Sequence, residues 1–366
     1  MIRFEARSEP SRAMRWVSPL VAVAATVAVG FALFSWLGLP PLGALHAFFI
    51  KPVSTVYGVG ELLLKASPIL LCALGLAIGY RANVWNIGAE GQLTIGAICG
   101  GGVALALQPH GGAWLLLLMT VAGAGGGAAW SAIPAWLRTR FGASEILTSL
   151  MLVYVATLLL SYLVQGPWRD PEGYNFPQSR TFAAAAMWPI LLPSTRVNAS
   201  ILVALAAVAL AWVLVAKTLI GFQMRVAGAS PAAAAYAGIP ARRVVWLAML
   251  AGGTAAGIAG VGEAAGPIGQ LLPSMSPGYG FAAIIVAFVG RLHPLGILLA
   301  SLLMSLLYLG GETAQIELGM PSAVTGLFQG TLLFFLLAAD VFIGYRWRLR
   351  ARPALPGKLR TAAADA

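Results

Sequence analysis

The sequence predicts an all-α polytopic membrane protein with about ten transmembrane helices, both termini in the cytoplasm and one short helix in a cytoplasmic loop. Of the 366 residues, 59% are hydrophobic and only 10% are charged, whereas a soluble domain carries about 25% charged residues. Apolar runs of about 18 to 23 residues recur along the chain, and this length crosses a hydrocarbon core of about 30 Å. Such a chain cannot cover a soluble globule with polar surface, so we expect its helices to lie in a bilayer.

The apolar runs predict the spans and their orientation. The first run is too long for a signal-peptide core and has no convincing cleavage site, so we expect it to be retained. With the N-terminus inside, all but five of the 23 Lys and Arg residues lie on the inner side, which predicts that both termini are cytoplasmic. The five outer residues are Lys51, Lys65, Arg169, Arg180 and Arg196. The ten expected spans are 16–38, 62–80, 90–108, 113–137, 145–165, 198–216, 244–262, 279–290, 294–310 and 321–343.

These spans divide the chain into an N-terminal cytoplasmic tail (1–15), a membrane domain (16–345) and a basic C-terminal tail (346–366) that we expect to be disordered beyond Pro353. The longest outer connections are 39–61 and 166–197, and the second, rich in Pro and Gly, is expected to be a loop. The carboxylates Glu263, Glu312 and Glu317 are expected to face the outer side, where a solvated rim is favoured over a surface that receives a binding protein.

Composition excludes several other classes. The net charge of +11 follows the positive-inside pattern, and no aromatic–basic recognition module is present, so we expect no nucleic-acid binding. Cys72 and Cys99 lie in apolar runs and are expected to be small core residues, because no disulfide framework or metal-ligand spacing is present.

Gly and Ala at three- and four-residue spacing in 123–127 and 252–262 predict close helix packing.

The cytoplasmic loop 217–243, KTLIGFQMRVAGASPAAAAYAGIPARR, specifies a helix of its own. Ser230 suits the N-cap and Pro231 the first helical position, and four alanines follow. Gly238 suits a left-handed C-cap, and Pro240 prevents continuation. A helix of about two turns is unstable alone in water, so it must dock either on its own bundle or on a cytosolic partner. Tyr236 and Ile239 are apolar enough to enter a partner's groove.

Residues 81–92, RANVWNIGAEGQ, predict a break between two spans. Gly88 and Gly91 allow the chain to leave the helix, and we expect Asn83 and Asn86 to cap the half-helix that follows. Backbone at membrane depth leaves a helix only where it is buried in protein or lines a water-filled cavity.

Glu90 and Gln92 then begin the third span. A buried ionisable side chain at this depth needs a partner, and Arg81 is the nearest candidate for Glu90 in the sequence.

Two motifs resemble one family. GASPAAAAYAGI, residues 228–239, resembles the G-x-N/S-P-x-A-A-x-Y-x-G-I coupling-helix motif of ABC importer permeases. RANVWNIGAEGQ resembles the hallmark of the nucleoside branch of the simple-sugar and nucleoside permeases, a branched-chain amino acid-like family. The resemblance runs along most of the chain, with the two motifs in the expected order. Ser230 stands where many relatives carry Asn, and both side chains cap helices.

The resemblance implies a permease subunit whose short helix enters a cleft of an ATP-binding subunit. It also implies a second homologous permease, an extracytoplasmic substrate-binding protein or lipoprotein, and a multi-pass location in the bacterial cytoplasmic (inner) membrane. No GxxxxGK[ST] phosphate loop occurs in the sequence, so we expect this chain to bind no cofactor, with ATP and Mg held by partner subunits. The residues implied in ATPase coupling are Gly228, Ser230, Pro231, Ala233, Tyr236, Gly238 and Ile239.

Residues 81–92 have three possible roles. They line a translocation path for a polar solute, with Trp85 as a stacking face, or they form a polar clasp that holds a bent helix and its gate, or they are a simple loop. A position near the cytoplasmic end of the bilayer favours the gate or clasp. The candidate path or gate residues are Arg81, Asn83, Trp85, Asn86, Gly88, Glu90, Gly91 and Gln92.

The family resemblance favours nucleosides as the solute, while a simple sugar or another small polar solute stays open. The main alternative is a stand-alone secondary transporter or channel, which needs buried acidic residues for ion coupling. Glu90 is the only good candidate for such a residue, and this alternative leaves the short helix unexplained. An intramembrane enzyme would need a catalytic constellation that the sequence lacks.

Overall fold

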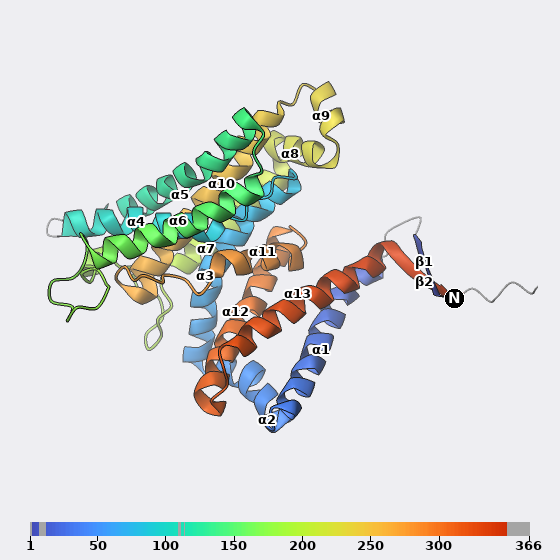
Figure 1. The fold of residues 1–366 in the computed structure, drawn as a ribbon, viewed down its shortest axis with the longest axis horizontal. Coiled ribbons are helices and arrows are strands. Elements are labelled where there is room, and N and C mark those ends of the chain that lie inside the picture. The colour runs from blue at the N-terminus through green and yellow to red at the C-terminus, as the bar shows by residue number, and fades with distance from the viewer. Residues whose placement is uncertain (1, 7–11, 109–110, 113, 350–366) are drawn as a thin grey trace, which may run out of the picture.

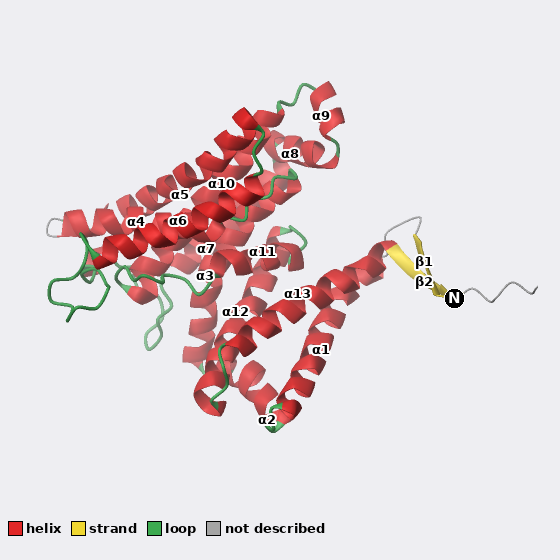
Figure 2. Ribbon diagram, viewed as in Figure 1, coloured by secondary structure: helices red, strands yellow, loops and turns green. Residues whose placement is uncertain are grey.

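Helices make up most of the described chain in the computed structural model, which describes residues 2–6, 12–108, 111–112 and 114–349 (Figures 1 and 2). A two-stranded antiparallel sheet joins β1 (Ile2–Ala6) and β2 (Tyr345–Leu349). The helices are α1 (Arg12–Trp36), α2 (Pro41–Leu45), α3 (Val56–Arg81), α4 (Ala89–Leu107), α5 (Trp114–Phe141), α6 (Glu145–Gln165), α7 (Ser200–Lys217), α8 (Leu219–Ala229), α9 (Pro231–Tyr236), α10 (Ala241–Glu263), α11 (Tyr279–Val289), α12 (Pro294–Leu318) and α13 (Ala323–Gly344). Short π or 3₁₀ turns occur at His46–Ile50, Lys51–Val53, Ala184–Ala186 and Ala264–Ile268.

Each expected span falls on one helix, and seven helices among the described residues are long and apolar enough to cross a bilayer. These seven are α3, α4, α5, α6, α7, α10 and α12. The chain is therefore a polytopic helical membrane protein. The number of crossings stays a prediction, because α11 and the apolar parts of α1 and α13 are shorter.

Three local expectations were incomplete. The connection 39–61 contains α2, and α3 already begins at Val56, where the Thr55 hydroxyl accepts a hydrogen bond from the Gly58 N–H (3.0 Å). The loop 217–243 contains α8 in addition to the expected short helix, and Thr218 caps α8 by accepting from the Gly221 N–H (3.1 Å). The tails at the two chain ends include β1 and β2, which pair with Ile2 opposite Leu349. The expected disorder beyond Pro353 lies outside the described residues.

Glycine contacts hold the centre of the bundle, as the small-residue spacing predicts. A Cβ on Gly257 of α10 would lie 2.1 Å from the Gly123 carbonyl oxygen of α5, and a Cβ on Gly127 would lie 2.2 Å from the Gly253 carbonyl oxygen. A Cβ on Gly96 of α4 would lie 2.4 Å from the Gly257 Cα. Backbones this close give the van der Waals packing that holds helices together in lipid, so α10 is fixed between α4 and α5.

The remaining helices form a second group. α1 packs along α13, and α12 contacts α3 and α11, which lies near the middle of the molecule (Figure 1). The β1–β2 ribbon sits at the end of α1 and α13, so the two ends of the described chain lie beside each other. α8 and α9 project together at one end of the α3–α10 bundle (Figure 1).

Candidate functional site

The break between α3 and α4 is closed by a reciprocal amide pair. The Asn86 Nδ2 donates to Gln92 Oε1 (2.9 Å), and the Gln92 Nε2 donates to Asn86 Oδ1 (3.0 Å). Both side chains are buried. A buried amide costs free energy unless its donors and acceptors are paired, so this pair holds the non-helical segment against the first turn of α4.

The two glycines of the segment let it approach α6. A Cβ on Gly88 would lie 2.9 Å from the Ser149 carbonyl oxygen, and a Cβ on Gly91 would lie 2.8 Å from the Val153 Cα. The Ile87 N–H donates to the Ser149 hydroxyl (3.1 Å). The glycines thus serve close packing, beyond the break that we expected them to permit.

The expected caps were wrong. Gly88 itself is the N-cap of α4, and no side chain caps this end. Asn86 Oδ1 instead accepts from the N–H of Gly88, two residues on (2.9 Å), which is an Asx turn. Asn83 adopts a left-handed conformation (φ +54°), and its Oδ1 accepts from the Trp85 indole N–H (2.9 Å).

Glu90 does not pair with Arg81, contrary to expectation. The Glu90 carboxylate accepts from the Gly280 N–H in the first turn of α11 (2.6 Å). Beside it, the Ser276 hydroxyl accepts from the N–H groups of Gly278 (3.1 Å) and Tyr279 (2.8 Å). A helix N-terminus presents unpaired N–H groups and the positive end of the helix dipole. The Gly280 N–H and the positive end of the α11 dipole therefore stabilise the buried carboxylate, and no ion pair between Glu90 and a described cationic side chain accompanies them.

Arg81 lies at the other end of the break. Its Nε and Nη2 both donate to the Leu292 carbonyl oxygen (3.0 and 2.6 Å), in the turn between α11 and α12. This partner could not be predicted from residue types, because any residue can supply a backbone carbonyl.

Trp85 lies in an aromatic stack. Its ring centroid is 5.8 Å from that of Phe288 in α11 and 5.2 Å from that of Tyr80 in α3, and Phe288 stacks on Tyr80 at 5.2 Å. Trp85 as a whole residue is 37% exposed. Protein rings therefore cover part of the face that we considered for stacking on a solute.

Glu145 joins the same region, and its role was missed. Its Oε1 accepts from the Trp85 backbone N–H (3.3 Å) and pairs with Arg138 of α5. The start of α6, the end of α5 and the break therefore meet at one ion pair.

The short helix forms as expected. The Ser230 hydroxyl accepts from the Ala233 N–H (3.3 Å), Pro231 is the first residue of α9, and Gly238 has a φ of +73°. Ile239 is buried against the bundle, so it is not available to a partner's groove. Tyr236 is 97% exposed.

The outer carboxylates differ from the expected rim. Glu263 is buried, while Glu312 pairs with Lys65 (2.8 Å) and Glu317 pairs with Lys51. A further pair, Glu61 with Arg196 (2.8 and 2.5 Å), joins α3 to the loop before α7, and these hydrogen bonds raise the pKa of the Arg196 guanidinium above its usual value. Side chains of distant segments neutralise one another here, which local sequence does not reveal.

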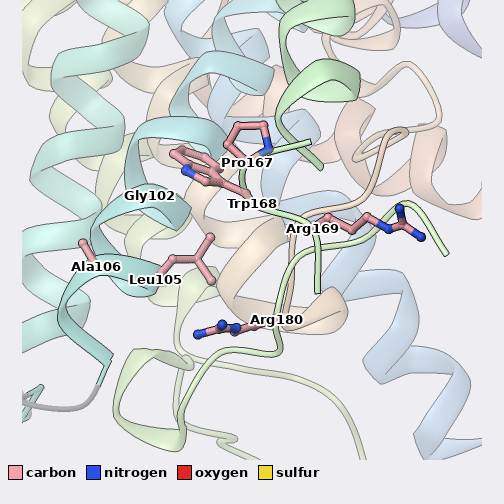
Figure 3. A pocket seen from close by; sticks show the side chains of 7 residues that line it. All are labelled: Gly102, Leu105, Ala106, Pro167, Trp168, Arg169 and Arg180. Atoms are coloured by element: carbon pink, nitrogen blue, oxygen red, sulfur yellow. The ribbon is translucent and has the colours of Figure 1, made fainter. Parts of the chain in front are cut away.

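A pocket of about 370 Å³ lies at the end of the bundle opposite α9. The last turns of α4 line it with Gly102, Leu105 and Ala106, and the Trp168 ring lies 2.9 Å from the position that a Cβ on Gly102 would take (Figure 3). Arg180 extends below Leu105, whereas Arg169 points away from it (Figure 3). No described carboxylate lies within ion-pair distance of either arginine. The loop 166–197 therefore presents cationic side chains beside an indole at this end.

No group of three or more His, Cys, Asp or Glu side chains in the described part of the chain could hold a metal ion. The arrangement is one of packing contacts and hydrogen bonds between helices that meet at the break.

Known proteins match this chain over most of its length. Residues 58–337 match the family described as the permease component of the branched-chain amino acid transport system. The chain is 36% identical to a glucose ABC transporter permease protein of Haloferax volcanii, over 93% of each chain. It is 30% identical to a guanosine ABC transporter permease protein of Bacillus subtilis, over 88% of this chain and 92% of that one. It is 27% identical to a nucleoside ABC transporter permease protein of Lactococcus lactis, over 87% and 89%.

The match spans the break, the short helix and every helix from α3 to α12. The chain therefore belongs to the branched-chain amino acid-type permease family, as a permease subunit of an ABC importer.

Proposed function

We propose that this permease subunit imports nucleosides. The observation that carries the proposal is the segment RANVWNIGAEGQ, which resembles the hallmark of the nucleoside branch. Two of the three relatives described above are named for guanosine or nucleosides. The relative with 36% identity is named for glucose, and this favours a simple sugar as the second candidate.

Competition for uptake separates the two candidates. We would reconstitute the complete transporter in proteoliposomes and follow labelled guanosine in the presence of ATP. Unlabelled guanosine should compete fully, while free ribose, free guanine and glucose should compete weakly. Full competition by glucose, or uptake of labelled glucose with none of guanosine, would replace the nucleoside by a sugar.

The partners follow from the same proposal. Cytosolic ATPase subunits would bind α9, a second homologous permease would share the membrane pathway, and an extracytoplasmic binding protein or lipoprotein would deliver the solute near the loop 166–197. ATP and Mg would bind only to the ATPase subunits. Gentle solubilisation of the tagged chain from its native membrane, followed by mass spectrometry, should recover an ATPase and a second permease. Purification of the chain alone would contradict this assembly.

The proposed topology has ten crossings in a bacterial inner membrane, with α9 and both termini in the cytoplasm. The distribution of Lys and Arg supports this orientation, and the pairing of β1 with β2 is compatible with two termini on one side. With Cys72 and Cys99 replaced by alanine, single cysteines at Ala235 in α9 and at Tyr174 in the loop 166–197 should react with a membrane-impermeant maleimide from opposite sides of sealed vesicles.

In the transport cycle, ATP-driven closure of the ATPase subunits would move α9 and shift the bundle between inward- and outward-facing states. This is differential stabilisation of two conformations, with no covalent step in this chain. The residues proposed for coupling are Gly228, Ser230, Pro231, Ala233, Tyr236, Gly238 and Ile239, and those proposed for the gate or path are Arg81, Asn83, Trp85, Asn86, Gly88, Glu90, Gly91 and Gln92.

Replacing Gly238 by valine should uncouple ATP hydrolysis from uptake. A Cβ at Gly238 would meet no atom within 4 Å, so the strain comes only from its φ of +73°. A β-branched residue in this conformation costs about 1–3 kcal/mol and should shift the end of α9. We expect uptake per ATP hydrolysed to fall about tenfold in proteoliposomes.

The matched control is Gly238→Asn, because asparagine tolerates left-handed backbone. This variant should retain most of the coupling. Equal coupling in the valine variant and the wild type would remove the proposed role of the α9 C-terminus.

A further inference from the structure

The 81–90 segment holds the short helix α11 at both ends and connects it to the helix pair α8–α9. Glu90 accepts from the Gly280 N–H at the start of α11. Arg81 donates to the Leu292 carbonyl oxygen just beyond its other end. Between them, Phe288 of α11 stacks on Trp85 and on Tyr80. One continuous segment therefore contacts the beginning, the last turns and the exit of a helix that lies about 190 residues further along the chain.

Contacts with α3 and α1 hold the turn that follows α11. Arg291 and Leu292 both adopt left-handed conformations (φ +54° and +56°), which residues with a Cβ rarely take. Strained residues of this kind persist only where their surroundings fix them. Arg81 supplies one such contact through two N–H groups, and Arg291 Nη2 donates to the Ser18 hydroxyl of α1 (2.6 Å).

The opposite side of Arg81 faces the helix pair α8–α9. A Cβ on Gly228, in the last turn of α8, would lie 2.0 Å from the Arg81 carbonyl oxygen and 3.2 Å from the Ala82 carbonyl carbon. Gly228 is two residues before Ser230, which caps α9. Ala234 and Ile239 bury their side chains in the same apolar cluster as Ile78 and Ala82 at the end of α3. Packed contacts therefore join α9 to the end of α3, and only one non-helical residue, Ser230, separates α9 from α8, which touches the Arg81 backbone.

We propose that Arg81 is the positioning residue that transmits movement of α9 to α11, and that α11 is the gate helix of this permease. The Arg81 backbone contacts α8, and the Arg81 guanidinium donates hydrogen bonds to the α11–α12 turn. α11, only 11 residues long, then moves as one body with the 81–90 segment. The inference rests on the proposed function, since it assumes that ATP drives α9. Coupling of this kind requires packed elements with two discrete arrangements, and the α11–α12 turn is the element that would change.

The test measures two distances in the reconstituted complex. Cys72 and Cys99 are replaced by alanine, and spin labels are placed in pairs at exposed positions. Leu117 with Ala235 reports the movement of α9, and Leu117 with Phe281 reports the movement of α11. In the wild-type background, trapping with ATP and vanadate should change both distances.

In Arg81→Gln the Leu117–Ala235 distance should still change on trapping, whereas the Leu117–Phe281 distance should not. Uptake per ATP hydrolysed should fall about tenfold, because hydrogen bonds from a charged donor contribute free energy of that order. Arg81→Lys, which keeps the charge but not the two parallel donors, should lose less, and it replaces Arg81→Gln if that variant does not fold. Gly228→Ala should separate α8 from the Arg81 backbone. The movement of α9 should then no longer be accompanied by the movement of α11, although the Arg81 guanidinium is intact.

The matched control is Arg243→Gln, which removes an exposed cation at the start of α10 and should change neither distance. An unchanged α11 shift in both Arg81 variants would overturn the inference, and so would a wild-type α11 that stays still while α9 moves and uptake proceeds. Absence of ATP-dependent uptake in the wild type would instead overturn the proposed function, and the inference with it.

Discussion

Replacing Gly257 by valine is expected to prevent recovery of a folded permease. This glycine lies where three helices meet, because a Cβ on it would sit 2.1 Å from the Gly123 carbonyl oxygen and a Cβ on Gly96 would sit 2.4 Å from its Cα. The obstructing atoms are backbone, so no side-chain rotation relieves the overlap. Overpacking in a dense core costs about 1–3 kcal/mol and occasionally more. Here it must separate α10 from α5, so we expect the upper end of that range or beyond.

The measurement is the fraction of the expressed chain that elutes as a single species in mild detergent, together with its Tm. Gly125→Val is the matched control, because Gly125 lies on the same helix as Gly123 and a Cβ there meets nothing within 4 Å. The control should elute normally with a Tm close to that of the wild type. A Gly257→Val protein with the yield and Tm of the control would show that α10 does not depend on backbone contact.

Local sequence signals explain most of what could be predicted. The apolar runs located every long helix, because hydropathy is summed over many residues and tolerates errors at the ends. α9 was predicted from Ser230 to Gly238, since a cap, a proline and a glycine specify a helix independently of the rest of the chain. α8 was not predicted, although Thr218 supplied the same kind of cap. The whole of 217–230 was interpreted as a connecting loop, and this segment contains a helix of 11 residues.

The partners of the polar residues could not be predicted in the same way. Glu90, Arg81 and the Trp85 N–H find their partners in α11, in the α11–α12 turn and in α6, far away in sequence. Two of these partners are backbone groups, which leave no mark on residue type. The expected Glu90–Arg81 pair assumed that each charged side chain needs a side chain of opposite charge. Instead, the N-terminus of α11 pairs with Glu90, and a backbone carbonyl oxygen pairs with Arg81.

Removing the carboxylate of Glu90 is the second change with a large expected effect. Glu90→Ala leaves the Gly280 N–H without its acceptor in a buried position. An unpaired buried donor costs about 1–3 kcal/mol, and the lost attraction between a carboxylate and a helix N-terminus adds up to about 2 kcal/mol in partly buried geometries. We expect a lower Tm in detergent and loss of most ATP-dependent uptake, because the start of α11 is no longer attached to α4.

Two controls separate this structural role from ion or solute binding. Glu90→Gln keeps an oxygen that can accept from Gly280, so it should recover most of the Tm and of the uptake. Glu312→Gln breaks an ion pair whose carboxylate is 47% exposed, and such pairs contribute at most about 1 kcal/mol. If Glu90→Gln folds with the Tm of the wild type but transports nothing, the negative charge itself is required. In that case Glu90 would have to contact the solute or an ion, and capping of α11 would not explain its burial.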